Sequence, residues 1–122
     1  MYIKLLKSKI HRAKITEKNL EYEGSITIDA QLMQSAQIQN YEKVHVLNIT
    51  NGGRFETYAI PGRVNSGEIC INGAAAHLVA LQDKIIILSY CQIEKNKAAK
   101  YHPIIVSVDD DNKILKKNLV NN

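Results

Sequence analysis

The stretch Tyr22-Glu23-Gly24-Ser25-Ile26-Thr27-Ile28-Asp29 places a Gly-Ser pair at the start of a β-branched run. A Gly-Ser pair taken alone indicates only a turn. Within a strand, however, glycine is unfavourable unless the backbone needs an unusual conformation or a close approach to another group. This stretch therefore marks Gly24 and Ser25 as a candidate site for chemistry on the backbone itself.

One reaction suits a serine that follows a glycine in such a place. The Ser25 hydroxyl attacks the Gly24 carbonyl and converts the peptide bond into an ester. Elimination then cuts the chain and leaves dehydroalanine, which hydrolyses to a pyruvoyl group at the N-terminus of residue 25. Under this hypothesis the chain of 122 residues becomes fragments 1–24 and 25–122.

Apolar and β-branched runs between turn residues predict a chain made mostly of short strands. The predicted strands cover 2–14 (as one or two strands), 25–28, 41–50, 54–60, 68–71, 84–93 and 104–108. Asp29 is a suitable N-cap for a helix over 30–36, and a second short helix is expected over 74–79. Asn51-Gly52 is a strong hairpin signal. The segments 61–67, 110–112 and 116–122 are expected to be a loop, a turn and a frayed tail.

Many short strands with two small helices indicate a mainly β protein, most simply a compact β-barrel. Patterning alone does not choose the topology of the barrel. At 122 residues the chain is long enough for one core and too short for two, so we expect a single domain over 1–122.

Composition excludes several classes of protein. No apolar run approaches the roughly 20 residues of a membrane span, and lysines occupy the N-terminus where a signal peptide is apolar. We therefore expect a cytoplasmic protein. The net charge of +4 comes from scattered lysines, as on a solvated surface, although a nucleic-acid-binding role stays open. Cys70 and Cys91 are expected to be reduced thiols, and no metal site is expected from the cysteine or histidine spacing.

Several residues have both an ordinary and a functional interpretation. Arg54 is either an exposed strand residue or a two-pronged clamp on a carboxylate. Thr57 and Tyr58 are neighbours on one strand, so their side chains point to opposite faces. Both can serve one site only through a twist, a bulge or separate roles at a subunit interface. Tyr22 is expected to be a packing residue, and Lys9 a solvated charge.

The run Asn72-Gly73-Ala74-Ala75 predicts a turn into a helix, with small residues that allow tight packing. The same run suits an anion site. Gly73 lets the backbone approach a ligand, and the first free N–H groups of the helix can bind a carboxylate.

Three segments occur in a fixed order: the Gly24-Ser25 stretch, Asn51-Gly52-Gly53-Arg54-Phe55-Glu56-Thr57-Tyr58-Ala59-Ile60 and Ile71-Asn72-Gly73-Ala74-Ala75-Ala76-His77. Together they resemble the pyruvoyl-dependent aspartate 1-decarboxylases. The likeness is carried by motifs from Lys9 to about His77 and is looser beyond. It implies a six-stranded double-ψ β-barrel and a homotetramer with active sites between neighbouring subunits.

The resemblance also implies an activity and a cofactor. Ser25 becomes a pyruvoyl group that forms a Schiff base with L-aspartate and accepts electrons as carbon dioxide leaves. The product is β-alanine, a precursor of pantothenate and coenzyme A. Thr57 is implied in self-cleavage, where its hydroxyl stabilises the oxyanion at Gly24, and Tyr58 in returning a proton to the α-carbon.

The remaining residues that match the family's motifs are expected to bind the substrate. We assign Arg54 to the side-chain carboxylate, because strong pairing to the departing carboxylate raises the barrier. The further binding residues are Lys9, Thr57, Asn72, Gly73, Ala74 and Ala75. Two alternatives remain: an uncleaved or inactive homologue, and a basic β-barrel that binds nucleic acid. A maturation factor for cleavage also stays open.

Overall fold

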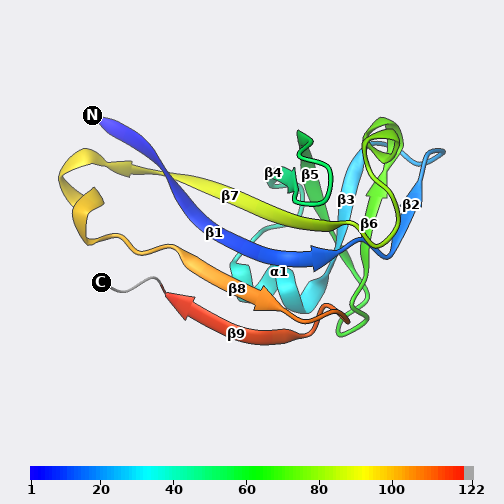
Figure 1. Ribbon diagram of the computed structural model, residues 1–122. Helices are drawn as coiled ribbons and strands as arrows, with labels where there is room; N and C mark the ends of the chain where they lie inside the picture. Colours follow the sequence, from blue (N-terminus) through cyan, green and yellow to red (C-terminus); the bar gives the residue numbers. More distant parts are fainter. Residues whose placement is uncertain (120–122) are drawn as a thin grey trace.

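In the computed structural model, residues 1–119 are described, and they form nine strands, one α-helix and two 3-10 helices (Figure 1). The strands are β1 (Tyr2–Lys14), β2 (Glu17–Asn19), β3 (Ser25–Asp29), β4 (Lys43–Asn48), β5 (Arg54–Gly62), β6 (Ile69–Asn72), β7 (Lys84–Glu94), β8 (Ile104–Val108) and β9 (Ile114–Leu119). The helices are α1 (Ala30–Ala36), η1 (Gly73–Leu78) and η2 (Lys95–Lys100). The protein is thus mainly β, as expected.

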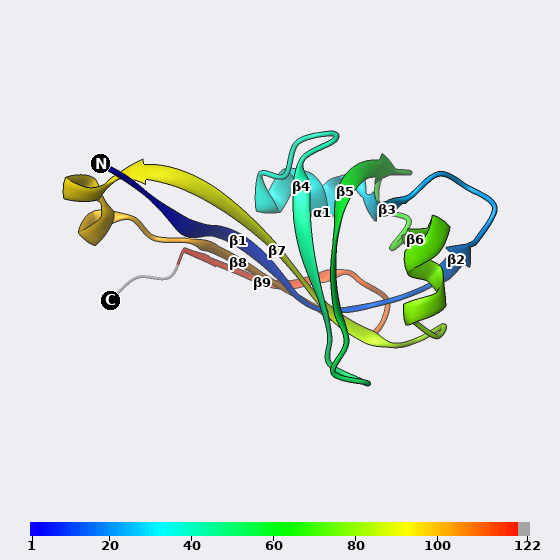
Figure 2. The same ribbon diagram turned by 90° about the horizontal axis from the view of Figure 1, so that it is seen from above.

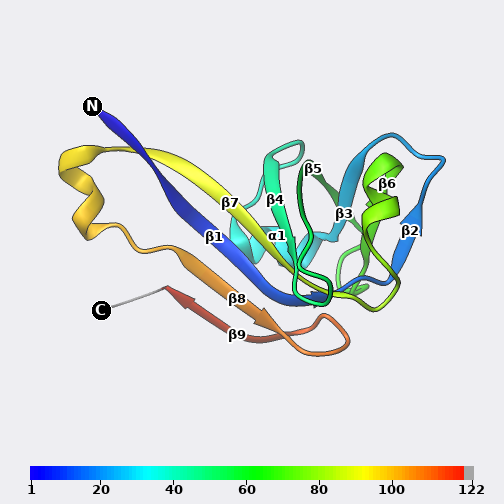
Figure 3. The same ribbon diagram turned by 45° about the horizontal axis from the view of Figure 1, so that its top comes forward.

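The strands follow one another in the order β2-β6-β3-β5-β4-β7-β1-β8-β9. Strands β1, β7, β8 and β9 form a long ribbon that extends to one side, and β3, β6 and β2 lie at the other end (Figures 1 and 3). Most pairs are antiparallel, but β3 pairs with β5, β1 with β8 and β2 with β6 in parallel. Over residues 1–119 this sheet has nine strands and is not closed, so the closed six-stranded form is not confirmed.

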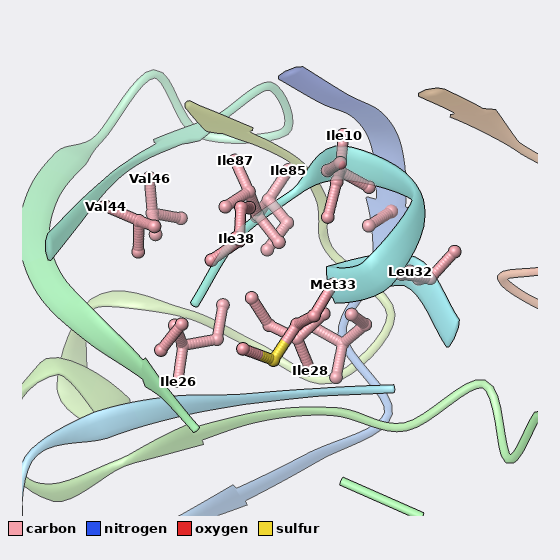
Figure 4. Packing of buried hydrophobic residues seen from close by; sticks show 14 of the residues in the cluster. Ile10, Ile26, Ile28, Leu32, Met33, Ile38, Val44, Val46, Ile85 and Ile87 are labelled. Carbon is pink, nitrogen blue, oxygen red and sulfur yellow. The ribbon is translucent and has the colours of Figure 1, made fainter. Parts of the chain in front are cut away.

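The core is built from β-branched side chains that alternate along the strands. Ile26 and Ile28 of β3 and Ile85 and Ile87 of β7 have no solvent exposure. Helix α1 covers this layer and adds its own apolar face, as the close view of the packing shows (Figure 4). Its buried residues include Leu32, Met33 and Ala36, the face predicted from the helical period.

Asp29 begins α1 as predicted. Its Oδ1 accepts a hydrogen bond from the Gln31 backbone N–H at 2.9 Å, which satisfies a free donor of the first turn. The same carboxylate accepts the N–H groups of Asn65 and Gly67, each at 2.9 Å. The cap therefore also fixes the loop between β5 and β6 against the start of the helix. Figure 2 shows α1 from above, next to β3.

Some predicted boundaries were wrong. Strand β5 continues through Pro61 and Gly62, which were expected in a loop. Pro61 is tolerated because β4 pairs only as far as Tyr58, so this end of β5 has a partner on one side only. The second helix is a 3-10 helix that begins one residue early, at Gly73.

Three elements were not predicted: β2, η2 and β9. Residues 116–119 belong to β9 and pair with β8, so this part of the expected tail was wrong, and 120–122 lie outside the described residues. Strands β2 and β9 are the two edge strands of the sheet, and η2 has no buried residue, so no apolar alternation marks these elements. Among residues 1–119 no helix has the length and apolar character to cross a membrane.

Candidate active site

Ser25 and Tyr58 lie on the same face of two parallel strands. The register pairs Ile26 of β3 with Ala59 of β5, and both are fully buried. Because side chains alternate along a strand, the residues one step earlier, Ser25 and Tyr58, share the opposite face. A pocket of about 280 Å³ contains both of them. Its other lining residues are Tyr22, Glu23, Asn40, Tyr41, Ile60 and Pro61.

Asn72 holds the Ser25 hydroxyl. The antiparallel register of β3 and β6 places the two residues opposite each other, and Asn72 Nδ2 donates to Ser25 Oγ at 2.9 Å. A second bond runs from Nδ2 to Thr27 Oγ1 at 3.0 Å. Ser25 Oγ therefore acts as an acceptor, which leaves its own hydrogen free to be transferred. Ser25 is 1% exposed, so this contact is shielded from bulk water.

The thiol of Cys70 orients the Asn72 amide. Cys70 Sγ donates to Asn72 Oδ1 at 3.2 Å, so the amide nitrogen is turned toward Ser25. Burial first, and then the charges of Glu17 and Glu68, raise the pKa of Cys70 to about 11. The side chain is thus a protonated thiol at neutral pH and remains a donor.

Gly73 is in close contact with the backbone at the proposed cleavage site. Its φ is +74°, and a Cβ at this position would lie 2.8 Å from both Cα and N of Gly24 and 3.1 Å from the Tyr22 carbonyl oxygen. Only glycine fits this contact without moving the backbone. A Cβ at Gly24 itself would meet no atom within 4 Å. The Gly24 backbone is therefore closely approached, as the sequence suggested, but the steric requirement for glycine in this contact falls on Gly73.

The structure does not bring Thr57 to this face. Thr57 pairs with the buried Val44, on the side of β5 that faces the core, opposite to Tyr58. Within residues 1–119 of one chain, Thr57 Oγ1 makes no hydrogen bond to the Gly24 carbonyl. Thr57 and Tyr58 point to opposite faces of β5, as predicted from strand alternation, and nothing in β5 twists both side chains into one pocket.

Lys9 and Arg54 also lie outside the Ser25 pocket. Lys9 is on β1, which is separated from β3 by β7, β4 and β5 in the sheet. Arg54 is exposed and precedes Tyr58 by four residues, about 13 Å along an extended strand. Among the described residues that line the pocket, Glu23 is the only charged one. One chain alone therefore offers no cation to an acidic substrate in this pocket.

The helix expected to bind an anion has a different local structure. η1 is one short 3-10 helix of six residues, with Ala74 exposed and Ala75 half-buried at its start. Asn72 precedes it but makes no capping bond, because its amide is engaged with Ser25 and Thr27. Among the predicted binding residues, Asn72 and Gly73 are thus the ones in contact with residues 24 and 25.

Six of the pocket residues were not predicted to be functional, among them Tyr22, Glu23, Asn40 and Tyr41. Tyr22 was expected to pack, yet it is 52% exposed and lines the pocket with Glu23. Asn40 and Tyr41 come from the loop between α1 and β4, and the Tyr41 and Tyr58 ring centroids are 6.2 Å apart. A loop tyrosine carries no sequence signal that assigns it to the site.

A larger pocket of about 450 Å³ lies elsewhere and contains none of the predicted site residues. Residues of β1, β4, β5 and β7, with one from the loop before β4, line it: Lys4, Glu42, Lys43, Val44, His45, Glu56, Tyr90, Cys91 and Gln92. Size alone therefore does not identify the reactive site, and we place it at Ser25 from the chemistry of the side chains.

Comparison with known proteins gives a consistent result. The family model described as aspartate decarboxylase matches residues 1–115. The chain is 58% identical to an aspartate 1-decarboxylase of Caldicellulosiruptor bescii over 95% of its length and 91% of the relative's. It is 56% identical to an enzyme of that name from Clostridium botulinum (strain Loch Maree / Type A3), with the same coverage. The relative of that name from Clostridium novyi (strain NT) is 53% identical over 95% of this chain and 94% of its own.

Proposed function

This chain belongs to the aspartate decarboxylase family, and we propose that it is a carboxy-lyase that converts L-aspartate to β-alanine and carbon dioxide for pantothenate synthesis. The single observation that carries the proposal is the Ser25 hydroxyl, held by Asn72 in a pocket that it shares with Tyr58. Family membership supplies the reaction, and this pocket supplies a place for it.

We propose that the chain cleaves itself between Gly24 and Ser25. Ser25 Oγ adds to the Gly24 carbonyl carbon, and the C–N bond breaks to give an ester and a free amine. Loss of the Ser25 α-proton then breaks the ester, so Gly24 leaves as a carboxylate, and water releases ammonia from the dehydroalanine. Asn72 holds Oγ with its hydrogen free, and Gly73 fixes the neighbouring backbone.

The residues around Ser25 fit the pyruvoyl group that cleavage generates. Residue 25 is buried and lines the pocket, and Asn72 Nδ2 can donate a hydrogen bond to an oxygen of residue 25. At position 73, the close contact with the Gly24 backbone leaves no room for a side chain. Asn72 would thus hold the group, while Gly73 contacts the backbone of Tyr22 and Gly24 on the other side of the proposed cut. Once formed, it supplies an electron sink for the pair released when a carboxylate departs as carbon dioxide.

Tyr58 is the proposed proton donor. Its phenol is a weak acid on the same face as residue 25, and a positioned acid can return a proton to the substrate α-carbon. Thr57 is proposed to stabilise the oxyanion at Gly24 during cleavage and to contact the substrate. Its support is the resemblance, since its side chain lies on the other face of β5 in one chain.

We infer that the functional unit is a homotetramer with active sites between subunits. Aspartate carries two carboxylates, yet the pocket of one chain contributes Glu23 and no cation among the described residues. Lys9 and Arg54 therefore act from a neighbouring subunit, with Arg54 on the side-chain carboxylate and the backbone of Gly73, Ala74 and Ala75 as further contacts. The guanidinium of Arg54 is exposed and free to reach across an interface.

Membership of the aspartate decarboxylase family also supports a more specific topology for the sheet. We propose that the central strands form the six-stranded double-ψ barrel of the family, with further strands added at the edges. Two of the three parallel pairs, β3 with β5 and β1 with β8, support this topology because they require the chain to cross over between them.

The activity is tested by incubating the purified protein with L-aspartate and measuring β-alanine and carbon dioxide. We expect turnover by the parent and none by Ser25→Ala, which has no hydroxyl to start the acyl shift. Tyr58→Phe is expected to be cleaved and to lose about 10²–10⁴-fold in kcat. Absence of β-alanine from fully cleaved parent protein would contradict the proposed reaction.

The same assay tests the shared site. Ser25→Ala and Arg54→Ala are each expected to be inactive alone. When the two are co-expressed, Ser25 of one subunit meets Arg54 of its neighbour, so part of the parent activity is expected to return. No recovery in a verified mixed tetramer would place Arg54 in its own chain's site.

A further inference from the structure

Tyr41 has a strained backbone beside the proposed proton donor. Its φ is +70°, in the left-handed region that bulky residues rarely adopt. The Glu42 N–H donates to the Gln39 carbonyl at 3.0 Å, which closes a β-turn over 39–42 with Tyr41 at its third position. Asn40 has no positive φ, so the turn resembles type II, where glycine or asparagine is usual at this position.

Several contacts hold this turn against β5 and β1. The Tyr41 N–H donates to the Ala59 carbonyl at 2.7 Å, and the Ala59 N–H donates to the Glu42 carbonyl at 2.9 Å. The Glu42 carboxylate accepts Lys7 Nζ at 2.7 and 2.8 Å and the Gln39 N–H at 2.9 Å. The turn is therefore fixed from both sides, and this is the condition under which a strained residue persists.

Burial of the Tyr41 side chain does not explain the strain. The residue is 71% exposed, so it contributes little to the apolar core. Its ring instead lies 6.2 Å from the Tyr58 ring, tilted by 47°, within the range of a favourable aromatic pair. Both rings line the pocket that contains Ser25.

We propose that Tyr41 is a positioning residue, whose ring fixes the Tyr58 ring and so holds the phenol in place at the pocket of residue 25. The inference rests on the proposed function, because it concerns the delivery of a proton by Tyr58. Asparagine or glycine at position 41 would suit the turn better but would provide no ring. The strained backbone of Tyr41 is therefore explained by the need for an aromatic side chain beside Tyr58.

The test compares kcat and KM for aspartate in parent, Tyr41→Leu and Tyr41→Asn, each normalised to the cleaved fraction. Loss of one aromatic contact is expected to lower kcat about 2- to 10-fold, with KM changed less than twofold. Tyr41→Phe keeps the ring and is expected to retain the parent kcat. Tyr41→Asn is also expected to raise the unfolding temperature, because asparagine tolerates the left-handed conformation.

Two controls separate positioning from a structural role. Tyr2→Leu removes another tyrosine of similar exposure, 69%, far along β1, and is expected to leave kcat unchanged. In the Tyr58→Phe background, where no phenol remains to be placed, Tyr41→Leu is expected to cost no further activity. A parent-like kcat in Tyr41→Leu, or an equal loss in both backgrounds, would overturn the inference. Inactivity of cleaved parent protein would instead overturn the proposed function.

Discussion

Asn72 illustrates how one buried amide can organise a reactive residue. Each polar end has a partner, with the Cys70 thiol on the oxygen and the Ser25 and Thr27 hydroxyls on the nitrogen. The three contacts admit only one orientation of the amide. Sequence reasoning placed Asn72 in the substrate-binding set, whereas the structure shows it in contact with the residue proposed to cleave the chain.

Replacement of Asn72 tests this role. In Asn72→Ala the Ser25 hydroxyl loses its donor, and we expect self-cleavage to slow about 2- to 10-fold, as for the loss of one hydrogen bond. Thr27→Val is the matched control, because it removes the other hydroxyl on Nδ2 at similar volume. We expect its cleavage rate to equal that of the parent in a time course of intact mass. Equal slowing in both variants would mean that the network acts through stability alone.

The positions of single side chains also show what can be predicted from a sequence. The alternation of a strand correctly separates Thr57 from Tyr58. The meeting of Ser25 with Tyr58 depends on the register between β3 and β5, which no local pattern encodes. Tyr41 was missed for the same reason, since its place beside Tyr58 results from a turn docked on a strand distant in sequence.

At the scale of elements, the junction of β6 and η1 determines the geometry at residues 22–24. The chain leaves β6 through Gly73 with a positive φ and passes within contact of the Gly24 backbone. A side chain here has to displace the strand entry or the start of η1. The close packing of the β6–η1 junction against residues 22–24 therefore depends on glycine at position 73.

Gly73→Ala is expected to destabilise the protein by about 1–3 kcal/mol, because alanine is strained at this φ and its Cβ meets backbone atoms. Thermal unfolding of the uncleaved Ser25→Ala background measures the change without interference from cleavage. Gly24→Ala is the matched control, since its Cβ would meet nothing within 4 Å. If both substitutions lower the unfolding temperature equally, the contact at Gly73 is not the cause.

Elements with strong local signals were predicted well. Asp29 and the apolar face after it predict α1 over the observed residues, and the apolar run of β8 gives its bounds. Strands β2 and β9 lack such signals, because pairing with a neighbour rather than an apolar pattern produces them. The helix η2 lacks one because none of its residues is buried. Pro61 misled the prediction for β5 because its tolerance depends on where β4 ends.

At the scale of the whole molecule, the pocket around Ser25 is incomplete for an acidic substrate. The cations predicted for binding lie elsewhere on the chain, on β1 and at the start of β5. A sequence lists the members of such a site but not the subunit from which each one comes. In the proposed homotetramer, Lys9 and Arg54 of a neighbouring subunit would complete this pocket.

We propose that the chain cuts itself between Gly24 and Ser25 to generate its own cofactor. Intact-mass measurement of purified, aged protein tests this most directly. Self-cleavage predicts two chains of 24 and 98 residues in the parent and one uncut chain of 122 residues in Ser25→Ala. Cleavage that appears only with cell extract would indicate a maturation factor. A parent protein that stays whole under all conditions, including with extract, would contradict the claim.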